Sequence, residues 1–252
     1  MPNNSSAGGA IINLLQITDC HLTKDPEGDL LGVKTRESLN AVLELIDANL
    51  AAGIHSAPDY IFATGDLAQD ASPEAYRYFK ELMDGYSCPS SWFPGNHDDR
   101  EIMKSVIASG NELKKVIRLG AWQFVMLDSS VTGAVHGLID QQDLDTLEAA
   151  LSERPDLHTM VCLHHHPVAI DCAWLDTIGV HNRDELFDVL ARHNNVRALL
   201  WGHIHQELDG VRDGIKMYAT PSTCIQFLPK SDDFAVDPVA PGYRWMSLYP
   251  NG

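Results

Sequence analysis

Five short segments rich in aspartate and histidine constrain this chain most, because each follows a stretch that is predicted to be a buried strand. In chain order they are Asp19-Cys20-His21, Gly65-Asp66, Gly95-Asn96-His97-Asp98, His164-His165-His166-Pro167 and Gly202-His203-Ile204-His205. In open α/β sheets, ligands bind beyond the carboxyl ends of the strands. We therefore expect all five segments to meet at one site on one edge of the fold.

The apolar pattern predicts strands that alternate with helices, followed by a run of consecutive strands. The predicted strands are 11–18, 59–64, one ending at 92–95, 122–128, 158–163, 196–201, 206–212, 215–220, 223–227 and 243–249. The predicted helices are 36–51, 73–84 with Ser72 as N-cap, one starting near Arg100 and capped by Asp98 and Asp99, 141–151 and 183–192. This order predicts an α/β fold of two packed sheets with helices outside. We expect residues 11–252 to form one domain and residues 1–10 to be poorly ordered.

The spacing within the motifs predicts how their side chains point. Side chains two positions apart on an extended segment face the same way. Asp19 and His21 should therefore face one spot, and so should His203 and His205, with Ile204 turned into the core.

The residue types predict a pair of metal ions. Imidazole and carboxylate ligands without a thiolate suit iron, manganese or zinc. Asp66 is the expected bridge, because it is the only acid at the end of its strand, and a shared carboxylate can hold two metals about 3.5–4 Å apart. Such a pair lowers the pKa of a bound water towards about 7. The resulting hydroxide suits attack on a phosphoester.

Composition narrows the possible partners. The formal charge is −17, from 18 basic and 35 acidic residues, which argues against binding to nucleic acid or to anionic membranes. The first ten residues lack the basic region of a secretory signal. The 5 cysteines are odd in number and scattered, which indicates reduced thiols. We therefore expect a cytoplasmic protein.

The motifs resemble those of the calcineurin-like metallophosphoesterase superfamily, whose fold is a four-layer α/β/β/α sandwich of two mixed sheets. Longer stretches look like the bacterial class III cyclic 3′,5′-AMP phosphodiesterases. These stretches are residues 30–33, 63–70, 163–167, 201–208, 219–224 and 240–244. The resemblance covers nearly the whole chain.

The resemblance implies a role for each site residue. One metal ion would be held by Asp19, His21, Asp66 and His205, and the second by Asp66, Asn96, His164 and His203. His97 would stay off the metals and assist departure of the leaving oxygen. Substrate would contact His21, Asn96, His97 and His165, although His165 has an orienting or packing role as its alternative. The expected ions are Fe²⁺ or Mn²⁺, with Zn²⁺ or Co²⁺ as alternatives.

The implied activity is hydrolysis of cyclic 3′,5′-AMP to 5′-AMP by attack of a metal-bound hydroxide. The partner would be this small-molecule substrate, and the protein a monomer or homodimer. Loops around 30–33, 169–180 and 220–227 are expected to shape the pocket. One alternative is another small phosphoester, such as a glycerophosphodiester, a 2′,3′-cyclic nucleotide or a phosphomonoester. A remote alternative is a non-catalytic scaffold on the same fold, which would be expected to lose ligands that remain here.

Overall fold

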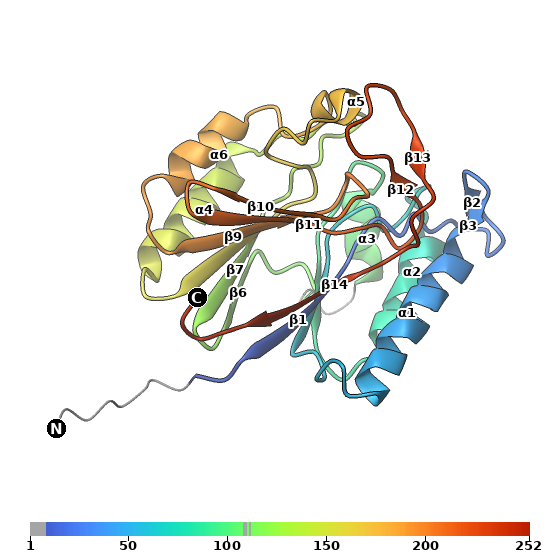
Figure 1. Cartoon of the computed structure of the whole chain (residues 1–252), viewed down its shortest axis with the longest axis horizontal. Helices are drawn as coiled ribbons and strands as arrows, with labels where there is room; N and C mark the ends of the chain where they lie inside the picture. Colours follow the sequence, from blue (N-terminus) through green and yellow to red (C-terminus); the bar gives the residue numbers. More distant parts are fainter. Residues whose placement is uncertain (1–8, 108–109, 111) are drawn as a thin grey trace.

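Two facing β-sheets form the centre of the computed structural model, which describes residues 9–107, 110 and 112–252 (Figure 1). The first sheet has the order β14 (Arg244–Leu248), β1 (Ile12–Ile17), β4 (Tyr60–Ala63) and β5 (Ser90–Trp92). The second has the order β10 (Leu208–Arg212), β11 (Ile215–Ala219), β9 (Val196–Trp201), β8 (His158–Cys162), β7 (Trp122–Met126) and β6 (Val116–Leu119). Both sheets mix parallel and antiparallel pairs.

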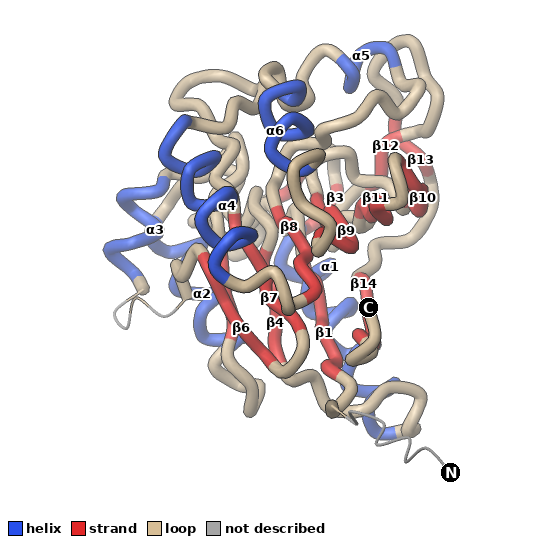
Figure 2. Tube along the Cα trace, turned by 90° about the vertical axis from the view of Figure 1, so that its left-hand side faces the viewer, coloured by secondary structure: helices blue, strands red, loops and turns tan. Residues whose placement is uncertain are grey.

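Helices cover the outer face of each sheet, as the tube view shows for α4 and α6 (Figure 2). The first sheet packs against α1 (Thr35–Ala51), α2 (Pro73–Met83) and α3 (Arg100–Val106). The second packs against α4 (Gln141–Glu153), α5 (Ala173–Asp176) and α6 (Arg183–Leu190). Two small hairpins pair β2 (Asp29–Leu30) with β3 (Val33–Lys34), and β12 (Gln226–Phe227) with β13 (Val236–Asp237). The predicted four-layer α/β/β/α architecture is confirmed.

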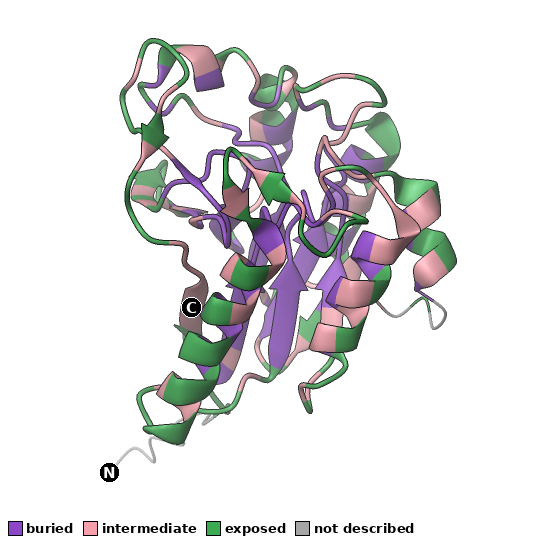
Figure 3. Cartoon of the chain, turned by 90° about the vertical axis from the view of Figure 1, so that its right-hand side faces the viewer, coloured by how far each residue is buried: buried purple, intermediate pink, exposed green. Residues whose placement is uncertain are grey.

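Alternation along the strands produces these layers. In β1, Leu14 packs between the sheets, whereas Leu15 packs against the helices. In β4, Phe62 faces inward and Ile61 outward in the same way. The central strands are accordingly buried on both faces (Figure 3). Each fully buried side chain of this size stabilises the fold by roughly 1.5–3 kcal/mol.

The predicted elements are present, with shifted ends in several cases. Ser72 caps α2 as predicted, because its side chain accepts a hydrogen bond from the Ala75 amide at 3.3 Å. Asp99 caps α3, but the capping role predicted for Asp98 is wrong. Of the predicted strand 223–227, only β12 forms. The backbone before it makes other contacts, since the Thr223 amide donates to the Thr18 carbonyl at 3.2 Å. Residues 1–8 of the predicted N-terminal segment lie outside the described residues.

The fold positions the five motifs at one edge. Strands β1, β4 and β5 run parallel in the first sheet, and β7, β8 and β9 run parallel in the second. The motifs follow β1, β4, β5, β8 and β9, as the strand-end argument predicts. No helix in the described ranges combines the length and apolarity needed to cross a bilayer.

Candidate dinuclear metal site

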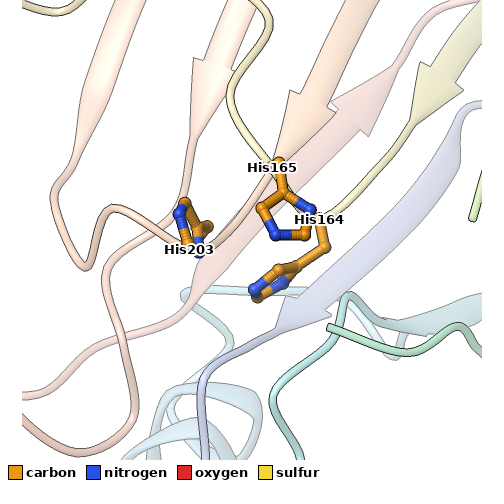
Figure 4. A group of neighbouring side chains, drawn as sticks. All are labelled: His164, His165 and His203. Atoms are coloured by element: carbon orange, nitrogen blue, oxygen red, sulfur yellow. The ribbon is translucent and has the colours of Figure 1, made fainter. Parts of the chain in front are cut away.

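Acidic and imidazole side chains from all five motifs converge at this edge. Ligand atoms lie within 4.8 Å of one another in four overlapping groups: Asp19, His21 and His205; His21, Asp66 and His97; Asp19, Asp66 and His164; and His164, His165 and His203. Figure 4 shows the last group, with two histidines following β8 and the third following β9. Asp66 belongs to the two middle groups, so it lies where a bridging carboxylate is expected.

The Asp66 carboxylate lies between the imidazoles of His21 and His164. Its Oδ2 atom is 3.3 Å from His164 Nε2 and 3.9 Å from His21 Nε2. Its Oδ1 atom accepts a hydrogen bond from the His97 backbone amide at 2.9 Å. The second carboxylate of the site, that of Asp19, has its Oδ1 atom 3.3 Å from His205 Nε2.

Hydrogen bonds at the opposite ring nitrogen fix the tautomers of three histidines. Nδ1 contacts the side-chain oxygen of Gln69 at 2.6 Å in His21, and it contacts backbone oxygens at 2.8 Å in both His164 and His205. An oxygen of this kind only accepts, so in the neutral form of each ring Nδ1 carries the proton and Nε2 presents a lone pair. His21 Nε2 and His205 Nε2 are 3.1 Å apart. Two lone pairs that face each other at this distance are suited to a cation between them.

Several buried polar atoms of the site lack a hydrogen-bond partner among the residues that the structure describes. Asn96 Oδ1, His164 Nε2 and His203 Nε2 are buried and have no hydrogen-bond partner within the described part of the chain. Burying an unsatisfied polar atom costs about 1–3 kcal/mol. Metal coordination would satisfy all three atoms, so the residues present fit two metal ions.

Burial and neighbouring charges set the protonation of the site. Burial opposes ionisation of Asp66, but the His164 imidazole outweighs it and holds the carboxyl pKa well below its usual value. Burial would lower the pKa of His164, but Asp66 outweighs it and raises the pKa to about 9. Burial lowers the pKa of His21 to about 4, and burial with nearby imidazoles holds that of His203 well below its usual value. His21 and His203 are therefore neutral at pH 7, the form that binds metals.

The backbone at the site adopts the left-handed region. The φ angles of Asp19, His21, Asp66, His203 and His205 are 54°, 46°, 51°, 65° and 47°. The predicted extended conformation of these segments is therefore wrong. Asp19 and His21 still belong to one ligand group, as predicted, but His203 and His205 belong to different groups. Non-glycine residues held this way cost of order 1–3 kcal/mol each. The strain indicates a site that the surrounding fold holds in place.

Glycine at position 95 lets two motifs approach closely. A Cβ atom there would lie 2.1 Å from Asp66 Oδ1 and 2.6 Å from the Asp66 backbone nitrogen. We expect Gly95→Ala to displace the Asp66 carboxylate and to lower metal affinity about 10- to 100-fold. Titration of the metal-free protein with Mn²⁺ measures the change. Gly210→Ala is the matched control, because its nearest neighbours would be 3.8 Å away, and equal affinity of the two variants would contradict the prediction.

Asp98 has a different structural role from the predicted helix cap. Its carboxylate accepts hydrogen bonds from the backbone amides of Leu67, Ala68 and Gly95 at 2.9–3.2 Å. The Tyr76 hydroxyl donates to it at 3.0 Å. These bonds tie the loop of Asp66 to the loop of Asn96. The buried Tyr76 hydroxyl thereby has the hydrogen-bond partner that such a group normally requires.

His165 is fully buried behind the ligand residues. Its Nδ1 atom lies 2.8 Å from the Ser129 hydroxyl, and its Nε2 atom has no partner among the described residues. The side chain does not line the cavity described next. Its substrate contact therefore remains a prediction.

A cavity of about 570 Å³ opens above the predicted metal-ligand residues. His21, Asp66, Asn96, His97, His203 and His205 form its floor. The predicted loops contribute Leu30, Leu31, Trp174, Leu175, Thr177, Ile178, Ile225 and Phe227 to its walls, so their placement is confirmed. Val135 and Phe234 also line it and were missed. The volume is in the range of small-molecule sites.

The fold and the site define a metallophosphoesterase, and comparison with known proteins agrees. Residues 12–207 match the family model described as calcineurin-like phosphoesterase, and the chain belongs to this family. It is 42% identical over 250 residues to the 3′,5′-cyclic adenosine monophosphate phosphodiesterase CpdA of Pseudomonas aeruginosa, covering 99% of this chain and 90% of that protein. It is 44% identical to the protein of the same name from Escherichia coli (strain K12), covering 98% and 88%.

A solved structure supports the same fold. The dimetal phosphatase from Danio rerio superposes with a TM-score of 0.68 at 15% identity, covering 95% of this chain and 96% of that chain. At this identity the likeness extends to the fold alone. The expected resemblance to the calcineurin-like family is thus confirmed.

Proposed function

We propose that this protein is a dinuclear metal-dependent phosphodiesterase that hydrolyses cyclic 3′,5′-AMP to 5′-AMP. The observation that carries the proposal is the cluster of carboxylates and imidazoles at the floor of a cavity with apolar walls. Such a cavity suits a ligand with a phosphate at one end and an apolar ring at the other. The nearly full-length similarity to phosphodiesterases with this named substrate supports the same assignment.

The ligand residues divide into two sets around Asp66. Asp19, His21, Asp66 and His205 would hold one ion, and Asp66, Asn96, His164 and His203 the other. When bound, such ions supply a water of lowered pKa and positive charge for the phosphoryl oxygens. The oxygen and nitrogen ligands favour Fe²⁺ or Mn²⁺, with Zn²⁺ or Co²⁺ as alternatives.

His97 is the proposed catalytic residue. Its side chain lines the cavity and is only partly buried, and its ring centroid lies 5.0 Å from that of His21. Hydrolysis breaks the bond between phosphorus and the ribose 3′ oxygen, which leaves needing a proton. An imidazole at the cavity floor is suited to donate it. The backbone hydrogen bond from His97 to Asp66 holds its position relative to the ligands.

The location, domain organisation and assembly of the protein are proposed as follows. We infer a cytoplasmic location, which the unpaired state of all five cysteines supports. Residues 11–252 are proposed to form one domain, because apolar layers connect both sheets and their helices. The proposed assembly is a monomer or a homodimer.

Turnover by the Mn²⁺- or Fe²⁺-reconstituted protein tests the function. Cyclic 3′,5′-AMP, its 2′,3′ isomer, glycerophosphocholine, a phosphomonoester and a generic aryl phosphodiester are assayed side by side. We expect a strong preference for cyclic 3′,5′-AMP. Preference for another of these esters would overturn the substrate assignment, and no hydrolysis by the metal-loaded protein would favour a non-catalytic role.

A further inference from the structure

We infer that Phe234, together with Trp174 and Phe227, forms the surface on which the base of the nucleotide stacks. The inference rests on the proposed function, because it assigns the part of the substrate that the metal ligands do not contact. It makes Phe234 a residue that determines which phosphoesters bind well.

The three aromatic rings form one cluster in the cavity wall. Trp174 lies 5.0 Å from Phe227 and 5.3 Å from Phe234 between ring centroids, in both cases edge to face. The Phe227 and Phe234 centroids are 5.6 Å apart. All three residues line the cavity. Because the rings are mutually edge to face, a flat ligand would stack on the face of one ring while the others flank it with apolar edges.

The cluster has a fixed position relative to the metal ligands. The Phe227 ring stacks on the His205 ring at 4.2 Å, with 16° between the planes. The Phe227 backbone amide donates to the His205 carbonyl at 3.2 Å, and the His205 ring contacts the Ile225 carbonyl. A phosphate group at the ligand residues would therefore place the rest of a small substrate against this wall.

Phe234 is held at the wall although it is exposed. Its side chain is 54% exposed, at the turn that joins β12 to β13. Pairing of Phe227 with Val236, and a hydrogen bond from the Ala173 amide to the Ser231 carbonyl at 3.1 Å, fix this turn to β12 and α5. Leu31 and Val135 line the same cavity and are also exposed, and a group of exposed apolar side chains around a cavity indicates a ligand-binding surface.

Stacking, rather than hydrogen bonding, is the recognition that this wall offers. Away from the metal ligands, His97 and Gln69, the described lining residues carry two polar side-chain groups, the Trp174 indole N–H and the Thr177 hydroxyl. The indole N–H is buried, and the Thr177 hydroxyl already donates to the Trp174 carbonyl at 2.6 Å. Aromatic stacking accepts any base, because every base has a π-face.

The test compares 5′-AMP with ribose 5-phosphate, which lacks only the base. Binding of each to the Mn²⁺-loaded protein is measured by calorimetry. We expect 5′-AMP to bind at least about tenfold more tightly than ribose 5-phosphate, and Phe234→Ala to reduce that ratio about tenfold without weakening ribose 5-phosphate. Binding of 5′-AMP should also quench tryptophan fluorescence, and Trp174→Phe should remove the quenching.

Leu228→Ala is the matched control, because Leu228 is 41% exposed on the same turn and is not among the cavity-lining residues. It should leave the ratio unchanged. Equal affinities of the wild-type protein for the two ligands, or an unchanged ratio in Phe234→Ala, would overturn the inference. Failure to hydrolyse cyclic 3′,5′-AMP would instead overturn the proposed function, and a base-dependent affinity that needs Phe234 would still support the stacking surface.

Discussion

Asp66→Asn is expected to abolish metal binding and phosphodiester hydrolysis together. The Asp66 carboxylate is buried and contacts imidazoles from both halves of the site at 3.3 and 3.9 Å. An amide has the same size but carries no charge and cannot bridge two cations. Metal content after dialysis, measured by mass spectrometry, should fall from two ions per chain in the wild-type protein to a trace. Turnover should fall to the background rate.

A stability measurement separates this loss from unfolding. A metal ion at 100 times its dissociation constant stabilises a protein by about 2.7 kcal/mol. Added Mn²⁺ should therefore raise the melting temperature of the wild-type protein but not of Asp66→Asn. Asp70→Asn is the matched control, because Asp70 lies on the same loop but is exposed and binds the backbone of Lys24 and Ser72. Retention of both ions by Asp66→Asn would refute the bridging role.

The layers of the fold could be predicted because they depend on local pattern. Alternating apolar residues such as Leu14 and Leu15 pack on opposite faces of β1, and every central strand follows the same rule. The position of the site followed from the same information, because the ligand motifs come directly after strands whose parallel direction brings their ends together. The sequence order of strands and helices was therefore sufficient for both.

Conformation within the motifs could not be predicted in this way. Extended spacing predicts that His203 and His205 face one spot, but both residues have positive φ and point into different ligand groups. Contacts from distant segments impose that backbone: the His203 amide binds the Asp19 carboxylate, and the His205 ring binds the Ile225 carbonyl. A left-handed residue stabilised by such partners has no local sequence signal.

Two residues of the cavity wall, Val135 and Phe234, were missed for a related reason. Phe234 and Val135 lie on loops without regular apolar spacing, and only the tertiary fold brings them above the ligands. Thr223 was expected in a strand, but its amide binds the Thr18 carbonyl just before Asp19. The proposed metal ligands can therefore be found from short motifs, whereas wall residues on irregular loops, such as Phe234 and Val135, are found from the structure.

His97→Ala is expected to lower turnover about 100-fold or more while both metal ions stay bound, as is typical when a general acid is removed. His97 lines the cavity and is not one of the seven proposed metal ligands. The backbone amide that binds Asp66 remains in the variant, so the bridging carboxylate keeps its position. Metal content, turnover and KM for cyclic 3′,5′-AMP are measured together. The loss should appear in kcat.

Choice of leaving group makes the His97 prediction specific. An alcohol such as the ribose 3′ oxygen needs a proton to leave, whereas a nitrophenolate does not, so the aryl diester should be affected much less by His97→Ala. His181→Ala is the matched control, because His181 is an exposed histidine that stacks on His136 and does not line the cavity. Equal losses with both substrates would assign His97 to binding or orientation, and unchanged turnover would remove it from the mechanism.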